Sequence, residues 1–366
     1  MVNDESGHEL IDELADEFLT RCLRGADPDI DDYCDAYPWL EQEIRQLFPM
    51  LRLLESNKAS GRILDVPEIV GPYRVVREIG RGGMGFVFEA VHESSQEVVA
   101  LKLLAREGGL DEDSAIQRFR REAKAVSAMQ HDHVVPIHDV GQHANLRYLA
   151  MTLIDGSSLD RIIRLLASAH RTKRDGWFES VMQHITGEKD QFADLDFYPW
   201  VAGLGRSIAE ALHAGHQIGI LHRDVKPSNL LIDRTGKAWL ADFGLAKMDD
   251  AKLTRTGQII GTLRYLAPER LQGHCDFRAD LYSLGLTLYE LLALRPAHVE
   301  DDRFELIAAI ERSDPDNPMD LQPRTPRTLA QIVMRAISKD PAQRFQSAND
   351  MAASLEQCQL ALSASA

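Results

Sequence analysis

The stretch His222-Arg223-Asp224-Val225-Lys226-Pro227-Ser228-Asn229, followed by the apolar Leu230-Leu231-Ile232, says most about the fold of this chain. It brings a carboxylate, an amine and an amide together within eight residues. These groups must lie on a loop, because Pro227 precludes a regular helix there. An acid so placed can accept a hydroxyl proton, an amine can neutralise developing negative charge and an amide oxygen can hold a metal ion. The stretch predicts a catalytic loop that leads into a strand; a solvated surface loop is the alternative.

A second acidic motif, Asp242-Phe243-Gly244, follows the short apolar run at 238–241. Magnesium prefers hard oxygen ligands and usually takes one or two from protein, while phosphates and water supply the rest. Asp242 and Asn229 therefore form a sufficient set of protein ligands. Phe243 is expected to pack inward and to fix the orientation of the aspartate.

Glycines recur in the stretch Ile79-Gly80-Arg81-Gly82-Gly83-Met84-Gly85-Phe86-Val87. Backbone amides can approach phosphate oxygens where no Cβ atom intervenes, as at Gly80, Gly82, Gly83 and Gly85. The pattern alone also fits a tight turn or the start of a dinucleotide-binding fold. A dinucleotide site needs a helix directly after the glycines, whereas residues 86–92 have the pattern of a strand. The context therefore favours a phosphate-binding loop inside a β-hairpin.

Lys102 ends the apolar, strand-like run Val99-Ala100-Leu101-Lys102. The small side chain of Ala100 leaves space for a flat ring, and the Lys102 amine is expected to bind the α- and β-phosphates of a nucleotide. A lysine in this role needs an anion to hold it, and Glu122, in the helical run at 118–129, is the candidate. Without the other motifs, Glu122 would be interpreted as a surface charge beside two arginines.

A polar loop, Lys252-Leu253-Thr254-Arg255-Thr256-Gly257, precedes the motif Ala267-Pro268-Glu269. A loop with so little apolar content has nothing of its own to bury, so added charge is expected to order it. Thr254 and Thr256 are the candidate phosphorylation sites. The basic groups expected to receive the phosphate are Arg223 and Lys247.

Taken together, these motifs resemble the protein kinase family in order and spacing, and most closely the bacterial serine/threonine kinases of the eukaryotic type. The resemblance covers about Tyr73 to Leu360, close to four-fifths of the chain. It implies an α+β, bilobal protein-kinase-like fold. A small lobe of antiparallel sheet with one helix would lie beside a larger, mainly helical lobe, with ATP in the cleft between them.

The resemblance also implies roles for individual residues. Asp224 would accept the substrate hydroxyl proton and Lys226 would neutralise the transferred phosphoryl group, so that the catalytic set is Asp224, Lys226, Lys102 and Glu122. The adenine ring would lie between Ile79, Val87 and Ala100 above and Leu231 below. Met151 would be the gatekeeper, and the backbone of 152–154, Leu153 included, would be the hinge that pairs with adenine.

The resemblance also concerns residues outside the catalytic and nucleotide-binding sets. By the same likeness Asp280 would brace the catalytic loop and Glu269 would pair with Arg344. Thr152 stands where relatives often carry Glu, a departure that concerns adenine or ribose contacts. His213 and His216, three residues apart on a helix, are interpreted as surface or core residues.

The chain is expected to have four parts. Residues 1–55 form an acidic helical segment, residues 56–72 a linker, residues 73–151 the small lobe and residues 152–362 the large lobe. Within the large lobe, residues from about 169 to 199 are expected to be an irregular insertion between two helices.

Composition and charge restrict the partners. With 44% apolar and 27% charged residues the chain is an ordinary globular protein, which excludes disorder throughout. Its net charge is −16, so nucleic acid is not expected as a partner, because a phosphate backbone needs a dense basic face.

The apolar stretch Leu281 to Leu294 contains polar residues and predicts a buried core helix rather than a membrane span. No membrane segment or secretory signal is expected, and the scattered cysteines (Cys22, Cys34, Cys275, Cys358) fit a reducing cytoplasm.

The sequence therefore predicts an ATP- and Mg²⁺-dependent kinase, with Mn²⁺ as an alternative metal, that phosphorylates serine or threonine of protein substrates. Autophosphorylation of the polar loop is the expected regulation, and a homodimer would allow it in trans. A pseudokinase scaffold is the first alternative. Such proteins usually lack the phosphate-binding lysine, the catalytic-loop aspartate or the metal-binding aspartate, and this chain has all three. A small-molecule phosphotransferase is the second, and the peptide-binding motifs Gly261-Thr262 and Ala267 to Glu269 argue against it.

Overall fold

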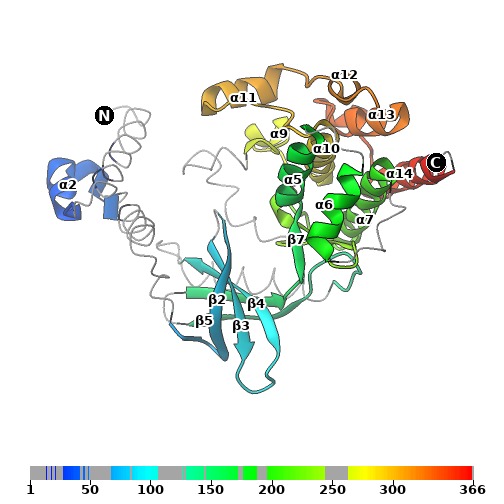
Figure 1. The fold of residues 1–366 in the computed structure, drawn as a ribbon. Coiled ribbons are helices and arrows are strands. Elements are labelled where there is room, and N and C mark those ends of the chain that lie inside the picture. Colours follow the sequence, from blue (N-terminus) through cyan, green and yellow to red (C-terminus); the bar gives the residue numbers. More distant parts are fainter. Residues whose placement is uncertain are drawn as a thin grey trace.

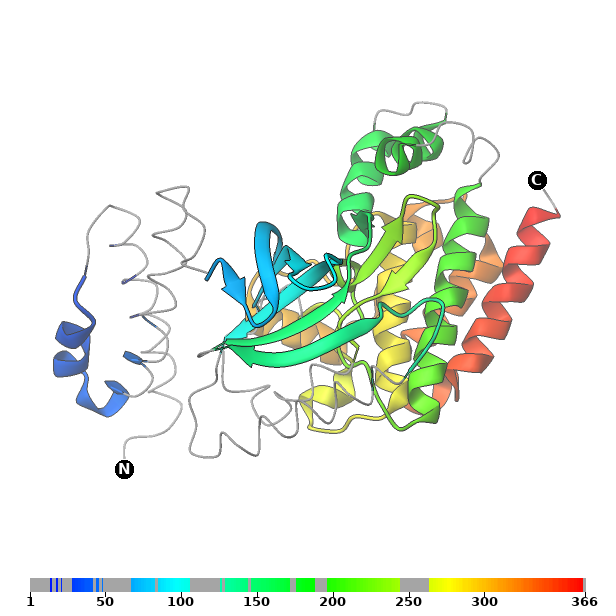
Figure 2. The same ribbon diagram turned by 90° about the horizontal axis from the view of Figure 1, so that it is seen from below.

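The structure is a computed structural model, which describes residues 28–41, 67–82, 85–105, 129–143, 146–171, 176–187, 196–243 and 263–364, and single positions 14, 18, 21, 44, 45, 48 and 126. A β-sheet lies on one side of a larger group of helices, and a short helix, α2 (Ile30–Ala36), lies apart from both (Figures 1 and 2). The predicted combination of a small sheet lobe and a large helical lobe is confirmed. Most of the helical run expected at 118–129 falls outside the described residues.

The sheet of the small lobe has six antiparallel strands in the order β1-β2-β3-β4-β6-β5. They are β1 (Ile69–Val70), β2 (Tyr73–Gly82), β3 (Gly85–His92), β4 (Val98–Ala105), β5 (Ile137–His143) and β6 (Leu146–Thr152). Side chains alternate between the faces of a strand. On β4, Val99 and Leu101 pack into one apolar cluster with Phe88, whereas Ala100 packs into another. Lys102 therefore shares the face of Ala100.

The large lobe is mainly helical. Its helices are α5 (Leu159–Arg171), α6 (Trp177–Thr186), α7 (Phe197–Gln217), α9 (Pro268–Leu271), α10 (Phe277–Ala293), α11 (Arg303–Arg312), α12 (Pro318–Leu321), α13 (Arg327–Ala336) and α14 (Ala348–Ser363), with 3₁₀ turns η2 (Pro227–Asn229) and η4 (Pro341–Gln343). Nearly every residue of α10 is buried, including its polar Ser283 and Thr287. The predicted core helix is confirmed, since α10 is buried along its length and α7, α12, α13 and α14 pack against it.

A three-stranded sheet carries the polar motifs. It contains β7 (Gly156–Ser158), β8 (Leu230–Asp233) and β9 (Ala238–Leu240) in the order β7-β8-β9. The loop quoted first leads into η2 and then directly into β8, as predicted. Asp242 follows the end of β9 by two residues, so this small sheet fixes where the first acidic motif ends and where the second begins.

The expected irregular insertion is partly a helix, and the prediction was wrong at 177–186. Phe178, Val181 and Met182 are buried on one side of α6 and join the core of the large lobe. Trp177 adds a ring contact, with its ring centroid 5.1 Å from that of Phe197. This apolar stripe explains why the segment folds despite the mixed charge around it.

The segment before the sheet has an apolar cluster of its own. Asp29 caps α2, where its side chain accepts a hydrogen bond from the Asp31 amide, and a 3₁₀ turn, η1 (Pro38–Leu40), follows. The cluster consists of Leu14, Phe18, Tyr33, Cys34, Leu40, Ile44 and Phe48. The helical character predicted for this segment is present in its described residues, while its boundary at residue 55 stays a prediction.

Candidate active site

Asp280 holds the loop that connects α7 to η2. This carboxylate on α10 is 1% exposed, and its two oxygens accept hydrogen bonds from the amides of His222 (2.9 Å) and Arg223 (2.7 Å). The Nε2 atom of His216 lies 2.9 Å from the same carboxylate. Burial by itself would raise the pKa of Asp280, but the hydrogen bond from His216 and the nearby histidines outweigh it, so the pKa lies below its usual value. The expected bracing role of Asp280 is confirmed by these contacts.

Arg223 has an unusual backbone conformation, with φ of +68°. A residue with a side chain reaches this left-handed region only when its surroundings hold it there. Here the surroundings act on both sides, because Asp280 accepts from its amide and the Arg270 side chain donates to its carbonyl oxygen. The strained turn is thereby fixed next to Asp224.

The ring of His222 is fully buried and links the two acidic motifs. Its Nδ1 atom lies 3.2 Å from the amide of Asp224, and its Nε2 atom lies 2.8 Å from the carbonyl oxygen of Ala241. An amide donates and a carbonyl accepts, so the proton of a neutral ring sits on Nε2. The ring of Phe243 meets His222 edge-on, at a centroid distance of 5.0 Å. Phe243 is 2% exposed, as predicted for a residue that packs inward.

Asp224, Lys226 and Asn229 form one contact group. The Lys226 amine lies 2.8 Å from Oδ2 of Asp224. The side-chain amide of Asn229 donates to the backbone carbonyl (2.7 Å) and to the carboxylate (3.0 Å) of Asp224. All three residues are more than four-fifths buried. The side chains of Lys226 and Asp224 are 17% and 8% exposed, and Asn229 is 7% exposed. The predicted catalytic-loop residues therefore lie together in space.

Lys102 and Asp242 bring the two lobes together. The Lys102 amine lies 2.6 Å from Oδ2 of Asp242, and the two side chains are 6% and 18% exposed. Burial alone would raise the pKa of Asp242, but the charge and hydrogen bond of Lys102, with smaller contributions from His222 and Lys226, bring it below its usual value. Asp242 also has a positive φ of 61°, a conformation that a residue with a side chain keeps only where its surroundings hold it.

The predicted adenine-site residues fall into one apolar cluster at the junction of the lobes. Ala100 and Met151 are buried in it, at 6% exposed each. The partly buried members of the same cluster include Ile79, Val87, Leu153 and Leu231. Residues from both lobes thus share an apolar surface beside Lys102.

Thr152 makes contacts away from that cluster. Its hydroxyl lies 2.9 Å from Nε2 of His138 on β5, and its amide donates to the carbonyl of Pro136 (2.9 Å). The residue that departs from the family pattern is therefore engaged with the neighbouring strand.

The donor set fits a divalent metal ion. Asn229 uses its NH₂ group on Asp224, which leaves its amide oxygen as an acceptor, and Asp242 supplies a carboxylate held in its charged form. Amide and carboxylate oxygens are the hard ligands that Mg²⁺ prefers. Five predicted site residues fall outside the described residues: Gly83, Glu122, Thr254, Thr256 and, as the candidate phosphate receptor, Lys247.

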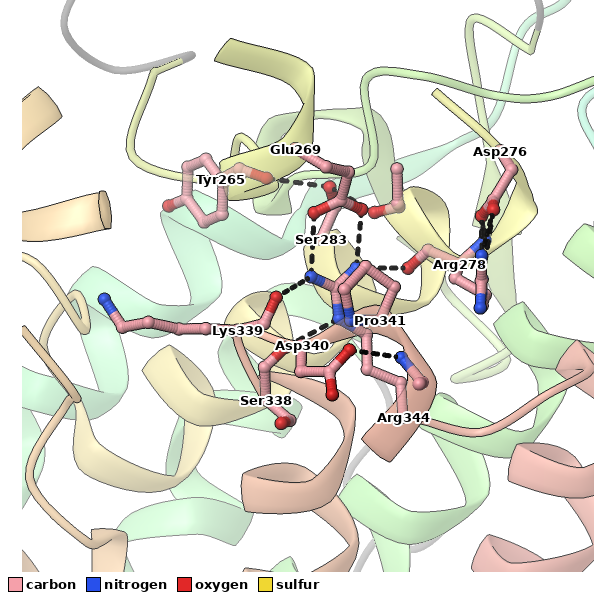
Figure 3. A network of polar contacts seen from close by, with 12 residues as sticks. Tyr265, Glu269, Asp276, Arg278, Ser283, Ser338, Lys339, Asp340, Pro341 and Arg344 are labelled. Carbon is pink, nitrogen blue, oxygen red and sulfur yellow. Dashed lines mark hydrogen bonds and ion pairs between the residues drawn. The ribbon is translucent and has the colours of Figure 1, made fainter. Parts of the chain in front are cut away.

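Glu269 pairs with Arg344, as predicted. Two guanidinium nitrogens of Arg344 donate to the two carboxylate oxygens of Glu269, at 2.7 and 2.8 Å. The Arg344 side chain is fully buried and also donates to the carbonyls of Arg278, Ser338 and Lys339 (Figure 3). The helix α9, which follows the polar loop, is thereby anchored to the core.

Two residues of this frame, His216 and Arg270, were not predicted. His216 was interpreted as a surface or core residue, yet its contact partner is Asp280. The partner lies 64 residues further along the chain, so no local spacing predicts the pair. Arg270 is 7% exposed directly after Glu269, and no local pattern marks its distant partner, Arg223.

Within the part of the chain that the structure describes, none of the helices combines the length and apolarity needed to cross a membrane.

Comparison with known proteins agrees with this geometry. Residues 73–355 match the family model described as "Protein kinase domain". The serine/threonine-protein kinase PknD of Mycobacterium tuberculosis is 37% identical over 295 residues, which are 78% of this chain and 40% of PknD. The serine/threonine-protein kinase PknH of Mycobacterium bovis is 35% identical over 289 residues, or 78% of this chain and 44% of PknH. The chain thus spans less than half the length of these relatives.

Solved structures show the same fold. The crystal structure of the Mycobacterium tuberculosis PknI kinase domain superposes with a TM-score of 0.56 at 27% sequence identity. The match covers 79% of this chain and 96% of that domain.

Proposed function

Because the chain belongs to the protein kinase family, we propose that it transfers the γ-phosphoryl group of ATP to serine and threonine hydroxyls of proteins, with Mg²⁺ as the metal. The observation that carries the proposal is a convergence: Lys102 and Asp242 lie 2.6 Å apart, next to the group formed by Asp224, Lys226 and Asn229. In phosphoryl transfer the protein mainly positions the reactants and neutralises charge. This group supplies both requirements.

Asp224 is the proposed catalytic base. Its carboxylate would accept the proton of the attacking hydroxyl and orient that oxygen. Asn229 donates to it at 3.0 Å and so limits its rotation. Lys226, 2.8 Å away, would neutralise the negative charge that develops on the transferred group.

ATP, when bound with its metal ion, supplies the phosphoryl group and a hard cation. Asn229 and Asp242 would hold Mg²⁺, or Mn²⁺ in its place, and Lys102 would bind the α- and β-phosphates with Glu122 as its anion. The proposed nucleotide contacts are Ile79, Gly80, Gly82, Gly83, Gly85, Val87, Ala100, Met151, Leu153 and Leu231.

Regulation and organisation are proposed from the same family membership. Thr254 and Thr256 would be autophosphorylated, and a homodimer would allow this in trans. We further propose residues 73–151 and 152–362 as the two lobes, with an insertion at about 169–199, after an acidic segment (1–55) and a linker (56–72). The separate apolar cluster around Tyr33 supports treating the acidic segment as its own unit.

The test is the substitution Asp224→Asn in the full chain. Transfer of labelled phosphate from ATP to a basic protein should fall by about 10²- to 10⁴-fold, because the base is lost. Nucleotide binding should stay within about twofold, since Asp224 is not proposed to touch the nucleotide. Asp316→Asn, at an exposed acid paired with Arg295, is the matched control and should behave as the wild type.

The outcomes separate the alternatives. Equal turnover in the variant would refute the assignment of Asp224. A wild-type chain that binds ATP but transfers no phosphate would favour the pseudokinase scaffold, and transfer to a sugar or antibiotic alone would favour a small-molecule phosphotransferase.

A further inference from the structure

The segment at 263–266, which leads into α9, is attached to the active-site frame by its backbone. The carbonyl oxygen of Tyr265 accepts a hydrogen bond from the hydroxyl of Ser283 on α10, at 2.7 Å (Figure 3). Further along, Arg270 donates to the carbonyl of Arg223 in the catalytic loop. Because Arg223 directly precedes Asp224, a polypeptide whose hydroxyl reaches Asp224 is expected to lie near the chain between 263 and 270.

The same segment is attached to α11 by its side chains. Leu263 and Leu266 form an apolar cluster with Leu306 and Ile310 of α11, and all four are at most 3% exposed. Apolar contacts of this kind supply attraction but little direction, because the hydrophobic effect is non-directional. These apolar contacts do not determine where the segment sits along α11.

Arg264 supplies the directional contacts. Its guanidinium group donates to the carbonyls of His298 (2.5 Å) and Glu300 (2.8 Å), in the loop before α11. It also donates to the Asp301 carboxylate at 3.0 Å. The Arg264 side chain is 15% exposed, whereas that of Asp301 is 99% exposed. An ion pair with so exposed a partner contributes little, so the two carbonyl contacts carry the attachment.

Only arginine suits this arrangement. A planar guanidinium offers several donors in a fixed fork, which can reach two carbonyls two residues apart at the same time. A lysine amine is a single point charge on a flexible chain and cannot reproduce the fork.

We propose that Arg264 is a positioning residue for the protein substrate: it locks the segment at 263–266 to the loop at 298–301, so that α11 and the surface beside Asp224 move as one unit. The inference rests on the proposed kinase function and names the residue that sets the position of the polypeptide-binding surface. Arg264 acts through the segment and touches none of the reacting groups.

The test compares Arg264→Lys and Arg264→Met with the wild type, using myelin basic protein as acceptor. Both variants should raise the KM for the protein by about tenfold, because two charge-assisted hydrogen bonds that order the segment are lost. The KM for ATP and the slow hydrolysis of ATP by water should stay within about twofold, since neither uses the segment. A merely structural role would not separate these two parameters.

Two control variants locate the effect. Asp301→Asn removes the exposed charge but keeps both carbonyl contacts, so it should match the wild type. Arg295→Lys changes an arginine in an exposed ion pair with Asp316 and should also match it. An unchanged KM for the protein in Arg264→Met would overturn the inference, as would an equal rise in the KM for ATP.

A measurement without turnover separates this inference from the proposed function. Binding of fluorescently labelled myelin basic protein should weaken by about tenfold in Arg264→Met, and amide hydrogen exchange at 263–271 should become faster. If the wild type transferred no phosphate, the proposed function would fail, while the inference would still be decided by these two measurements. Unchanged binding and unchanged exchange would overturn it.

Discussion

Lys102 and Asp242 form a nearly buried ion pair, with 2.6 Å between Nζ and Oδ2. Lys102 lies within β4 of the small lobe, whereas Asp242 follows β9 in the large lobe. Each charge satisfies the other in a place where water has little access. A buried charge without its partner is costly, so the contact couples the position of β4 to that of the acidic motif. Stability and catalysis therefore depend on the same two side chains, in different ways.

The substitution Lys102→Met should separate these two roles. It should lower the free energy of unfolding by about 3 kcal/mol, because the Asp242 carboxylate is left unpaired. Phosphate transfer should fall by about 10²- to 10³-fold, since one charged donor to the phosphates is lost. Chemical denaturation and a transfer assay measure the two effects.

The double variant Lys102→Met with Asp242→Asn is the control for this interpretation. Removing both charges should recover most of the lost stability, because no unpaired charge remains, whereas activity should stay low. Additive losses of stability in the double variant would show that the ion pair does not couple the lobes.

Gly215, on α7, leaves room for the ring of Phe243. A Cβ atom at this position would overlap the ring edge and also meet the carbonyl oxygen of Ile220. Alanine usually favours a helix over glycine by about 1 kcal/mol, but overpacking of a rigid site costs about 1–3 kcal/mol. Gly215→Ala should therefore destabilise the protein slightly. It should lower phosphate transfer by about tenfold, because a displaced Phe243 ring is expected to shift the adjacent Asp242.

Gly203→Ala, on the same helix, is the matched control. There the Cβ atom would meet the end of the flexible Gln359 side chain, which can move aside. This variant should keep wild-type activity and gain up to about 1 kcal/mol of stability from helix propensity. Thermal melts and transfer assays on both variants check the contrast; equal behaviour of the two would remove the role given to the Phe243 ring.

Much of the site could be predicted because its chemistry is carried by short local motifs. Pro227 precludes a regular helix, so the acid and the amine before it are expected on a loop, where their side chains can converge on a reactant. The strand-like pattern after Gly85 separates a hairpin from a dinucleotide-binding turn, and β3 begins at that glycine. The alternation along β4 places Lys102 on the face of Ala100.

What could not be predicted depends on contacts between distant positions. His216 and Asp280 are 64 residues apart, and Arg270 and Arg223 are 47 apart, so no local spacing reveals either pair. The helix α6 was missed for another reason. Its apolar residues follow helical spacing only over a short window, and the charged sequence on both sides obscures it.

Asp280 should make the stability of the protein depend on pH in a defined direction. Its pKa is lowered in the folded state, so its contribution is present above the unfolded value of about 3.8 and is lost as the pH falls through the folded value. Wild-type stability should therefore decline more steeply below pH 4 than that of Asp280→Asn. At pH 7 the variant should be the less stable protein, because the two carboxylate oxygens accept from different amides and asparagine keeps only one accepting oxygen, so either the His222 or the Arg223 amide loses its acceptor. Melting temperatures from pH 3 to pH 7 test this, and parallel curves would contradict it.

Substitution within the Arg344–Glu269 pair should change the stability of the fold without changing nucleotide binding. Arg344 is fully buried, and its guanidinium group satisfies two carboxylate oxygens and three carbonyls at once (Figure 3). Lysine cannot satisfy these acceptors, so Arg344→Lys should lower the free energy of unfolding by about 3–5 kcal/mol. Nucleotide binding should persist at temperatures where the variant remains folded, since neither residue reaches Lys102 or Asp242.

Arg335→Lys provides the comparison for that loss. Arg335 is exposed, and its guanidinium group lies 4.2 Å from the centroid of the Phe345 ring, a contact worth only about 0.5–1 kcal/mol at such a site. Denaturant midpoints with an unchanged m-value would show that both variants lose stability from the same folded state. If the two substitutions had equal effects, the buried network around Glu269 would not be what anchors α9.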